Sequence, residues 1–367
     1  MKNNSLLSKA ECDALRGIAI LGIMLHNYCH WLWFAIRENE YKFYMSRSQQ
    51  LADYFAAGTD EMLPVQLLSY FGHYGVPIFL FLSGYGLTLK YERKSVTSSH
   101  SVWQFSRFHY LKLLRMMVPG FAAFIVVDYL TRGPRGYAAE NVLALFGMVA
   151  NLLPEPNEAI WPGPYWFFGL MMQLYVVYRL LLFRRHWGFT VGLVVLCWLA
   201  QVACGPESSE LNWLRYNFIG GILPFGAGLL AARYLRPEHV EVSRFHWSLR
   251  LFLLSVAIIA GCFSFHSWLW VPFAICAAAV CLIKTLPSRA ISLFGWFGTI
   301  SAAMFVIHPV FRKIFIPISR HGEVYDGLLL YFIATLAFSW LTKQVMDKIA
   351  QPRMNNNAEN KTEENEG

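Results

Sequence analysis

Apolar residues in this chain are collected into segments about as long as a lipid bilayer is thick, and short basic or turn-rich stretches separate them. Of the 367 residues, 56% are hydrophobic and 15% are charged, which is typical of a polytopic membrane protein. A helix needs roughly 20 mostly apolar residues to cross the hydrocarbon core. Ten segments meet that description: 14–36, 64–90, 113–130, 165–183, 187–204, 216–235, 249–265, 268–283, 294–310 and 327–345. We therefore predict an all-α membrane protein with about ten transmembrane helices.

One further apolar stretch, residues 141–153, is too short to cross, and four prolines follow it within 154–164. We predict that it is a re-entrant or interfacial segment. The distribution of Lys and Arg agrees, because cytoplasmic loops collect these residues. With ten crossings and the N-terminus inside, 22 of the 31 Lys and Arg residues lie on the cytoplasmic side. Both termini are therefore predicted to be cytoplasmic.

The chain is predicted to hold one transmembrane domain, residues 1–350, followed by a disordered cytoplasmic tail, residues 351–367, which is rich in Asn and Glu. The net charge of +8 is explained by this topology and by anionic membrane lipid at the inner surface, so nucleic acid is not an expected partner. The seven cysteines include no CxxC pair. No metal site and no disulfide framework is predicted.

The first apolar segment contains two ionisable residues, Arg16 and His26. An ionisable group at membrane depth costs roughly 2.5 kcal/mol or more, so its presence is by default a hypothesis about function. The step between the two residues places His26 about 15 Å deeper than Arg16, near the bilayer centre. There an imidazole can act as a general base, because it titrates close to neutral pH. Arg16 stays at the cytoplasmic end, where Asp13 can pair with it on the same helical face.

Other polar residues in the apolar segments suggest a shared polar cavity. Taken singly, each of them, His26 included, is equally consistent with a hydrogen bond to a neighbouring helix or with close helix packing. They are His73, Ser83 and Gly84 in the second segment, Gln173 in the fourth, and His308 in the ninth.

Cations and aromatic residues are mixed on the predicted inner side between residues 90 and 115. Such a mixture suits a phosphorylated ligand that carries a ring, such as an acyl-coenzyme A, although a positive-inside anchor also explains most of it. Only Lys112 and Arg115, at the start of the third segment, are predicted to contact the ligand.

His321 and Asp326 have the His-x4-Asp spacing of soluble glycerolipid acyltransferases, but a match of this kind arises easily by chance and lies on the predicted outer side.

The chain carries a series of short motifs in this order: Asp13-x-Leu-Arg16-Gly-Ile-Ala, Gly75-Val-x-Ile-Phe-x-Phe-Leu-Ser83-Gly84-Tyr85, Lys112-x-x-Arg115, Trp166-Phe with Gln173-x-Tyr175, Ile222-Leu-Pro224-Phe225-x-x-Gly228, and Ile300-Ser301 with His308-Pro309. In that order the motifs resemble the bacterial membrane-bound acyltransferase family 3, which is known for ten-helix O-acetyltransferases of surface sugars.

The resemblance implies transfer of an acyl group, such as acetyl, from a cytosolic acyl-coenzyme A to a hydroxyl of a glycan or lipid-linked sugar. It implies that His26 is the catalytic histidine, that Arg16 supports either the histidine or the donor, and that Lys112 and Arg115 contact the coenzyme. Ser83 and Gly84 are further candidates for the donor site. The acyl-coenzyme A is a substrate, and no tightly bound cofactor is expected. The location implied is the bacterial cytoplasmic (inner) membrane.

One departure from the family concerns the first helix. Family members separate the basic residue from the histidine by ten residues, which returns both to within about 20° of one helix face. Here nine residues intervene, so Arg16 and His26 lie about 80° apart on a regular helix. A bulge beside Gly22 is one way to realign His26; otherwise His30 or Asn27 takes over part of its role.

Two other classes of protein remain open at this point. A transporter or flippase for sugars or lipids also has about ten helices with buried polar residues, although no inverted repeat is evident. A structural partner in envelope assembly explains the buried ionisable groups least well. Acyltransferase chemistry explains them best.

Overall fold

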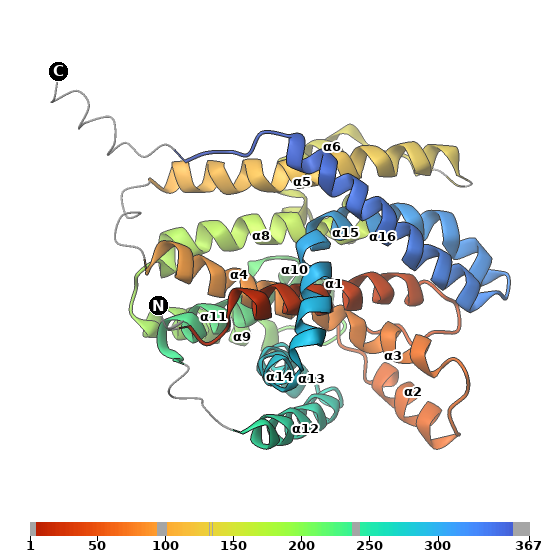
Figure 1. Ribbon diagram of the computed structural model, residues 1–367, viewed down its shortest axis with the longest axis horizontal. Coiled ribbons are helices and arrows are strands. Elements are labelled where there is room, and N and C mark those ends of the chain that lie inside the picture. The colour runs from red at the N-terminus through yellow and green to blue at the C-terminus, as the bar shows by residue number, and fades with distance from the viewer. Residues whose placement is uncertain (1–4, 94–100, 132, 134, 237–242, 355–367) are drawn as a thin grey trace.

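A computed structural model describes residues 5–93, 101–131, 133, 135–236 and 243–354 of the protein. Part of the predicted tail, from residue 355 on, lies outside the described residues. Regular structure within them is entirely helical, as predicted. The chain is a bundle of long, mostly apolar helices with short helices at one end (Figure 1).

The elements follow one another without a repeated unit. In chain order they are α1 (Lys9–Cys29), α2 (Met45–Ala56), α3 (Leu63–Phe71), η1 (Gly72–Tyr74), α4 (Gly75–Tyr91), α5 (Val102–Leu130), α6 (Ala139–Phe146), η3 (Ala150–Leu152), α7 (Pro156–Ala159), η4 (Gly163–Tyr165), α8 (Trp166–Val177), the π-helical turn η5 (Tyr178–Leu182), α9 (Trp187–Val202), α10 (Ser209–Tyr216), α11 (Phe218–Tyr234), α12 (Arg244–Gly261), α13 (Phe265–Trp268), α14 (Val271–Thr285), α15 (Ser288–Arg320) and α16 (Val324–Lys348).

Six helical stretches are long and apolar enough to cross a membrane, so the protein is a multi-pass membrane protein. They are Leu63–Glu92, Val102–Leu130, Gly163–Leu182, Arg244–Gly261, Ser288–Arg320 and Val324–Lys348. Three further apolar helices, α9, α11 and α14, are shorter. With the 21 residues of α1, these elements overlap all ten predicted segments. The short segment 141–153 forms only the end of α6 and the turn η3, too few residues to cross.

The helix α1 lies inside the bundle, where α15, α4 and α3 pack against it. Two glycines, Gly17 on α1 and Gly298 on α15, make this contact close. A Cβ atom at Gly17 would overlap the Phe294 carbonyl oxygen, and a Cβ atom at Gly298 would overlap the Asp13 carbonyl oxygen. Small residues let helix backbones approach in this way inside a membrane. The position of α1, which carries the candidate histidine, is therefore fixed by backbone contact.

Boundaries differ from the prediction at two functionally important places. The first helix ends at Cys29 instead of residue 36, and residues 30–44 form turns and extended chain before α2. The helix of the third predicted segment, α5, begins at Val102 instead of residue 113, so Lys112 lies in its third turn and Arg115 in its fourth. A capping box at Ser101 explains this start, because Ser101 and Gln104 bond each other's backbone amides.

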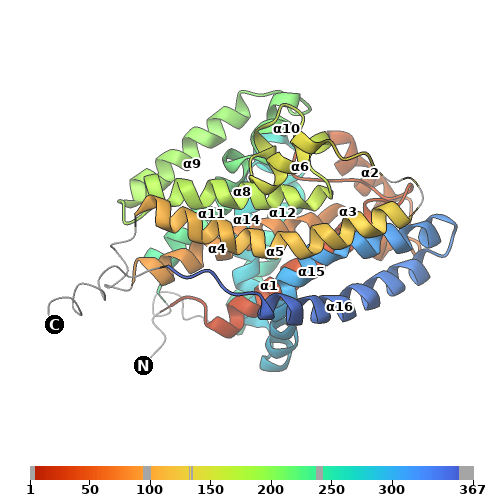
Figure 2. The same cartoon turned by 90° about the horizontal axis from the view of Figure 1, so that it is seen from above.

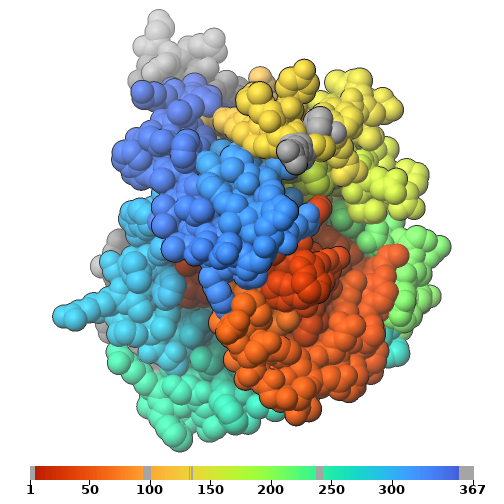
Figure 3. Space-filling model, turned by 90° about the vertical axis from the view of Figure 1, so that its right-hand side faces the viewer, coloured from red at the N-terminus to blue at the C-terminus, as the bar shows by residue number. Residues whose placement is uncertain are grey.

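Both ends of the described chain lie at the same side of the bundle, on the left in Figure 1, and the view in Figure 2 agrees. The opposite side carries α2, α3 and the turn between α15 and α16. Figure 3 faces that side, where the segment after α1 lies between α2 and α3 in orange and α15 and α16 in blue. The functional groups described below divide between these two sides.

Candidate active site

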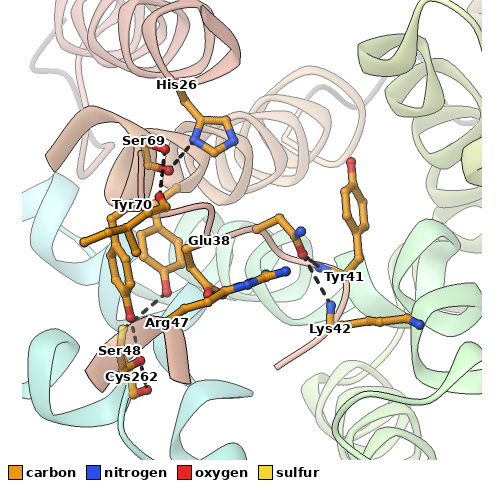
Figure 4. A network of polar contacts seen from close by, with 12 residues as sticks. His26, Glu38, Tyr41, Lys42, Arg47, Ser48, Ser69, Tyr70 and Cys262 are labelled. Atoms are coloured by element: carbon orange, nitrogen blue, oxygen red, sulfur yellow. Dashed lines mark hydrogen bonds and ion pairs between the residues drawn. The ribbon is translucent and has the colours of Figure 1, made fainter. Parts of the chain in front are cut away.

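His26 lies in the last turn of α1, three residues before the helix end at Cys29, rather than midway along it as expected. The side chain is buried, and its Nδ1 atom is 2.9 Å from the Ser69 carbonyl oxygen (Figure 4). Ser69 is the third residue from the end of α3, where the last carbonyls of a helix lack intrahelical partners. The histidine satisfies one of them.

This hydrogen bond determines which ring nitrogen of His26 carries the proton. A carbonyl oxygen only accepts, so Nδ1 must donate, and in the neutral imidazole Nε2 then holds the free electron pair. A Cβ on Gly72 would lie 2.7 Å from the His26 Cβ atom, so a glycine is needed where η1 passes the histidine. The ring is thus oriented as a general base must be.

The bulge proposed beside Gly22 is not present, because α1 is a regular α-helix from Lys9 to Cys29. Gly22 instead allows contact with η1: a Cβ there would lie 3.1 Å from the Gly72 carbonyl oxygen. Arg16 therefore stays about 80° and 15 Å away from His26 along α1. Its guanidinium pairs with Asp13 at 2.6 Å, as predicted for that pair.

Three histidines meet at the end of α1. The ring centroid of His26 lies 4.9 Å from that of His30 and 5.3 Å from that of His73. His30 Nδ1 and both ring nitrogens of His73 are buried without a protein hydrogen-bond partner. Among the described residues, no group of three or more His, Cys, Asp or Glu is arranged to hold a metal ion.

The three imidazoles line a cavity of about 170 Å³. Aromatic rings form much of its wall, including Tyr41 stacked on Tyr216 at 4.2 Å. Asn27, Glu40 and Arg312 add polar groups to the same wall. Sequence reasoning named the histidines but missed this wall, because its residues come from loops and helix ends far apart in the chain.

Arg312 is the main group that the sequence analysis missed. It lies on α15, one turn after the His308-Pro309 motif, and beyond residue 310, where the predicted segment ends. In the structure α15 continues to Arg320 and brings a buried guanidinium beside Asn27. An arginine so close to an apolar segment was the available signal.

The other predicted site residues lie away from this cavity. His308 is fully buried, with Nδ1 3.1 Å from the Met304 carbonyl oxygen of its own helix. Gln173 donates to Asn217 Oδ1 and accepts from the Phe218 amide, which ties α8 to the start of α11. The structure thus does not place these two residues among the cavity-lining groups.

Ser83 and Gly84 lie on α4. The Ser83 hydroxyl donates to the Phe79 carbonyl oxygen one turn earlier. A Cβ at Gly84 would overlap the Phe225 carbonyl oxygen of α11. In the structure Gly84 therefore serves helix packing, and its predicted place in a donor site stays a prediction.

Basic residues gather at the opposite end of α1. Lys112 lies within electrostatic range of Lys90, Arg16 and Arg115. The Lys90 ammonium is also 5.1 Å from the Phe108 ring centroid, and Arg115 donates to the Met346 carbonyl oxygen. The basic residues predicted to bind the donor therefore form a group with Arg16, at the side away from the histidine cavity.

Two carboxyl groups lie in the segment between α1 and α2: Glu38 is buried, and Glu40 is partly buried and lines the cavity. Burial raises the pKa of Glu38 to about 8, although Arg47, with Nη1 3.7 Å from the carboxylate, opposes the shift. Burial also raises the pKa of Glu40 to about 7, opposed by Arg215. Figure 4 shows the Arg47–Glu38 ion pair and the Tyr70–Ser48 hydrogen bond in the same region as the hydrogen bond between His26 and Ser69.

The helical bundle with long apolar helices defines a multi-pass membrane protein, and its polar cavity is lined by three histidines. The family model described as an acyltransferase domain matches residues 9–343, nearly the whole chain. The chain belongs to the membrane-bound acyltransferase family 3, and it is a membrane acyltransferase. No curated protein and no solved structure matches it.

We predict that Glu38 makes the protein less stable as pH rises. Because the folded-state pKa is raised above the ordinary value of 4.5, the folded state binds more protons than the unfolded state between those values. The stabilisation from proton uptake is complete below pH 4.5 and is lost as pH rises through about 8. The thermal midpoint of the purified protein, followed by tryptophan fluorescence, should fall between pH 5.5 and 8.5.

Glu38→Gln should flatten this pH dependence, leaving the smaller part that Glu40 contributes in the same direction. Ser46→Ala, an exposed position on α2, is the matched control and should keep the slope of the wild type. Equal slopes for Glu38→Gln and the wild type would contradict the assignment.

Proposed function

We propose that the protein is an O-acyltransferase that moves an acetyl group from acetyl-coenzyme A to a hydroxyl of a surface glycan or lipid-linked sugar. The observation that carries this proposal is His26, whose Nδ1 is bonded to a carbonyl and whose Nε2 is free to accept a proton. Attack by a hydroxyl on a thioester needs such a base. Membership of the acyltransferase family supplies the type of reaction.

The donor is proposed to bind at the opposite end of α1, where Lys112, Arg115 and Arg16 gather. Their cations suit the phosphates of coenzyme A, and the aromatic rings nearby suit its adenine. The flexible arm of the coenzyme then has to extend about 15 Å along α1 to bring the thioester to His26. A flexible arm that carries its acyl group at the far end is suited to this geometry.

The size of the cavity favours a short acyl group. About 170 Å³ is below the roughly 300–1,000 Å³ of pockets that enclose a drug-sized ligand. It accommodates an acetyl group and the attacking hydroxyl, while the rest of the acceptor stays outside. Stacked aromatic rings and the polar groups Asn27, Asn39 and Glu40 at the wall suit the faces and hydroxyls of a sugar.

The reaction is proposed to proceed by direct transfer. Nε2 of His26 takes the proton of the acceptor hydroxyl as its oxygen forms a bond to the thioester carbon, whose carbonyl electron pair moves to oxygen. The carbonyl then re-forms, the carbon–sulfur bond breaks, and the thiolate of coenzyme A receives the proton from His26. No other reactant is consumed. His30, 4.9 Å away between ring centroids, is proposed to help position the hydroxyl.

The proposed orientation follows from the charges. The side with the basic residues and both ends of the described chain faces the cytoplasm, because cytoplasmic loops collect Lys and Arg. The histidine cavity then opens toward the outer face of a bacterial cytoplasmic membrane. In this orientation the donor comes from the cytosol and the acceptor from the outside.

Substitution of His26 tests the base directly. His26→Ala should lower the rate of acetyl transfer in purified membranes by about 10²–10⁴-fold, because the proton acceptor is lost. His30→Ala should have a smaller effect. The measurement is mass spectrometry of the glycan for an acetyl-sized increment, with monodisperse elution of each variant showing that it is folded.

His186→Ala is the matched control, since that histidine is exposed at the start of α9, and it should retain full activity. If His26→Ala and His30→Ala both fold and still transfer the acyl group, the proposed catalytic role is wrong. Transport of a sugar or lipid without acylation would identify the protein's activity as that of a transporter instead.

Lys112→Ala should raise KM for acetyl-coenzyme A by about tenfold or more, because a charge-assisted contact to phosphate is lost, while kcat stays near the wild-type value. Steady-state kinetics at low and high salt measures both constants. Arg107→Ala is the matched control: Arg107 is exposed on α5 and lies about 140° around the helix from Lys112. Equal effects of the two substitutions would argue against a donor site at Lys112.

A further inference from the structure

Arg312 is a buried cation whose environment is unusual. Its side chain is 94% buried, and it lines the same cavity as His26. Its Nη1 atom makes long contacts with Asn27, 3.3 Å to Oδ1 and 3.5 Å to the carbonyl oxygen. Within the described ranges of the chain, these are its hydrogen bonds, and no carboxylate pairs with it.

A buried guanidinium without a counterion is costly, because its hydration is lost without an opposite charge to replace it. Trp31 compensates in part: the guanidinium carbon lies 4.7 Å from the ring centroid of Trp31, an electrostatically favourable position. Arg320 contacts the same ring at 5.8 Å and also donates to the Trp31 carbonyl oxygen at 2.8 Å. Trp31 is therefore held in place, and it fixes Arg312 in turn.

The missing negative charge has two sources in acyl transfer: the oxyanion that forms on the reacting carbonyl, or an acidic group on the acceptor. The cavity favours the first. Its volume of about 170 Å³ suits a reacting carbonyl and a hydroxyl but leaves little room for an acidic group beside them, and the ionised form of Glu40 on its wall would repel such a group. Arg312 also contacts Asn27, the neighbour of the proposed base His26, which places it beside the reaction.

We propose that Arg312 is the oxyanion-stabilising residue of this enzyme, donating from its guanidinium to the carbonyl oxygen of the acyl group. The inference rests on the proposed function and deepens it. When the hydroxyl oxygen bonds to the thioester carbon, the carbonyl electron pair moves to oxygen, and Arg312 stabilises that charge. When the carbon–sulfur bond breaks, the charge passes to the coenzyme thiolate, which His26 protonates. Nothing is consumed beyond the two substrates.

Steady-state kinetics of the full-length protein in proteoliposomes tests this role. Arg312→Ala should lower kcat by about 10²–10³-fold, the usual loss when an oxyanion donor is removed, with KM for either substrate within about threefold of the wild type. Arg312→Lys keeps the charge but not the planar guanidinium, so its kcat should lie between those of the wild type and Arg312→Ala. Added guanidinium ion should restore part of the kcat of Arg312→Ala, which a purely structural role would not allow.

Arg289→Ala is the control, because Arg289 is an exposed arginine of the same helix, α15, that does not line the cavity, and it should keep kcat within about twofold. A raised KM for the acceptor with unchanged kcat would overturn the proposal and identify Arg312 as an anchor for an acidic acceptor. Unchanged kinetics would overturn it as well. If Arg312→Ala does not fold, Arg312→Lys provides the test. A lower kcat with nearly unchanged KM supports the proposal, and an unchanged kcat overturns it.

The same experiment separates this inference from the proposed function. A wild-type protein that transfers no acyl group refutes the function itself. A wild-type protein that transfers acetyl, together with Arg312 variants that keep its kcat, refutes only the role of Arg312.

Discussion

The hydrogen bond from His26 Nδ1 to the Ser69 carbonyl oxygen is the interaction on which the proposed chemistry depends. It fixes the tautomer of the imidazole, so that Nε2 is the ring atom of this cavity-lining residue that can accept a proton. The bond forms only because α1 and η1 come into backbone contact at Gly22 and Gly72, and because α3 ends with carbonyls that need partners. Ser69 is itself held by its hydroxyl, which donates to the Ile36 carbonyl oxygen at 2.8 Å. The base is therefore positioned by the packing of three helices and not by its own helix alone.

The helix α1 also connects two chemically different sites. At one end Arg16 lies with the basic residues around Lys112, and at the other His26 lies among histidines, aromatic rings and Arg312. The ion pair with Asp13 satisfies Arg16 at the first end, and the hydrogen bond to Ser69 satisfies His26 at the second, where both ring nitrogens of His73 are buried without a protein partner. Contact with α15 through Gly17 and Gly298 holds the helix rigidly between them. A donor bound at one end and an acceptor at the other would thus meet at a fixed distance.

The sequence predicts the helical segments well, because a bilayer demands long apolar stretches and leaves few alternatives. It also indicates His26 and His30, since ionisable residues in such stretches are rare. It cannot place Arg312 against Asn27, because that contact joins residues 285 positions apart and depends on how far α15 continues. The same holds for His73, whose contact with His26 comes from the packing of η1 on α1. The bulge at Gly22 is absent, because Gly22 lets α1 pass close to η1 while α1 stays a regular helix. The arginine that lies beside Asn27 is Arg312 of α15 and not Arg16.

In the proposed reaction the acyl group passes through the protein from a donor site on one face to a hydroxyl on the other. Proteoliposomes with the protein in one known orientation test this path, using radiolabelled acetyl-coenzyme A and a membrane-impermeant glycan acceptor placed in chosen compartments. Labelled glycan should form only when the coenzyme is on the side of Lys112 and the acceptor is on the side of His26. Labelling of the glycan when both substrates are on the same side of the membrane, with none when they are on opposite sides, would contradict this path.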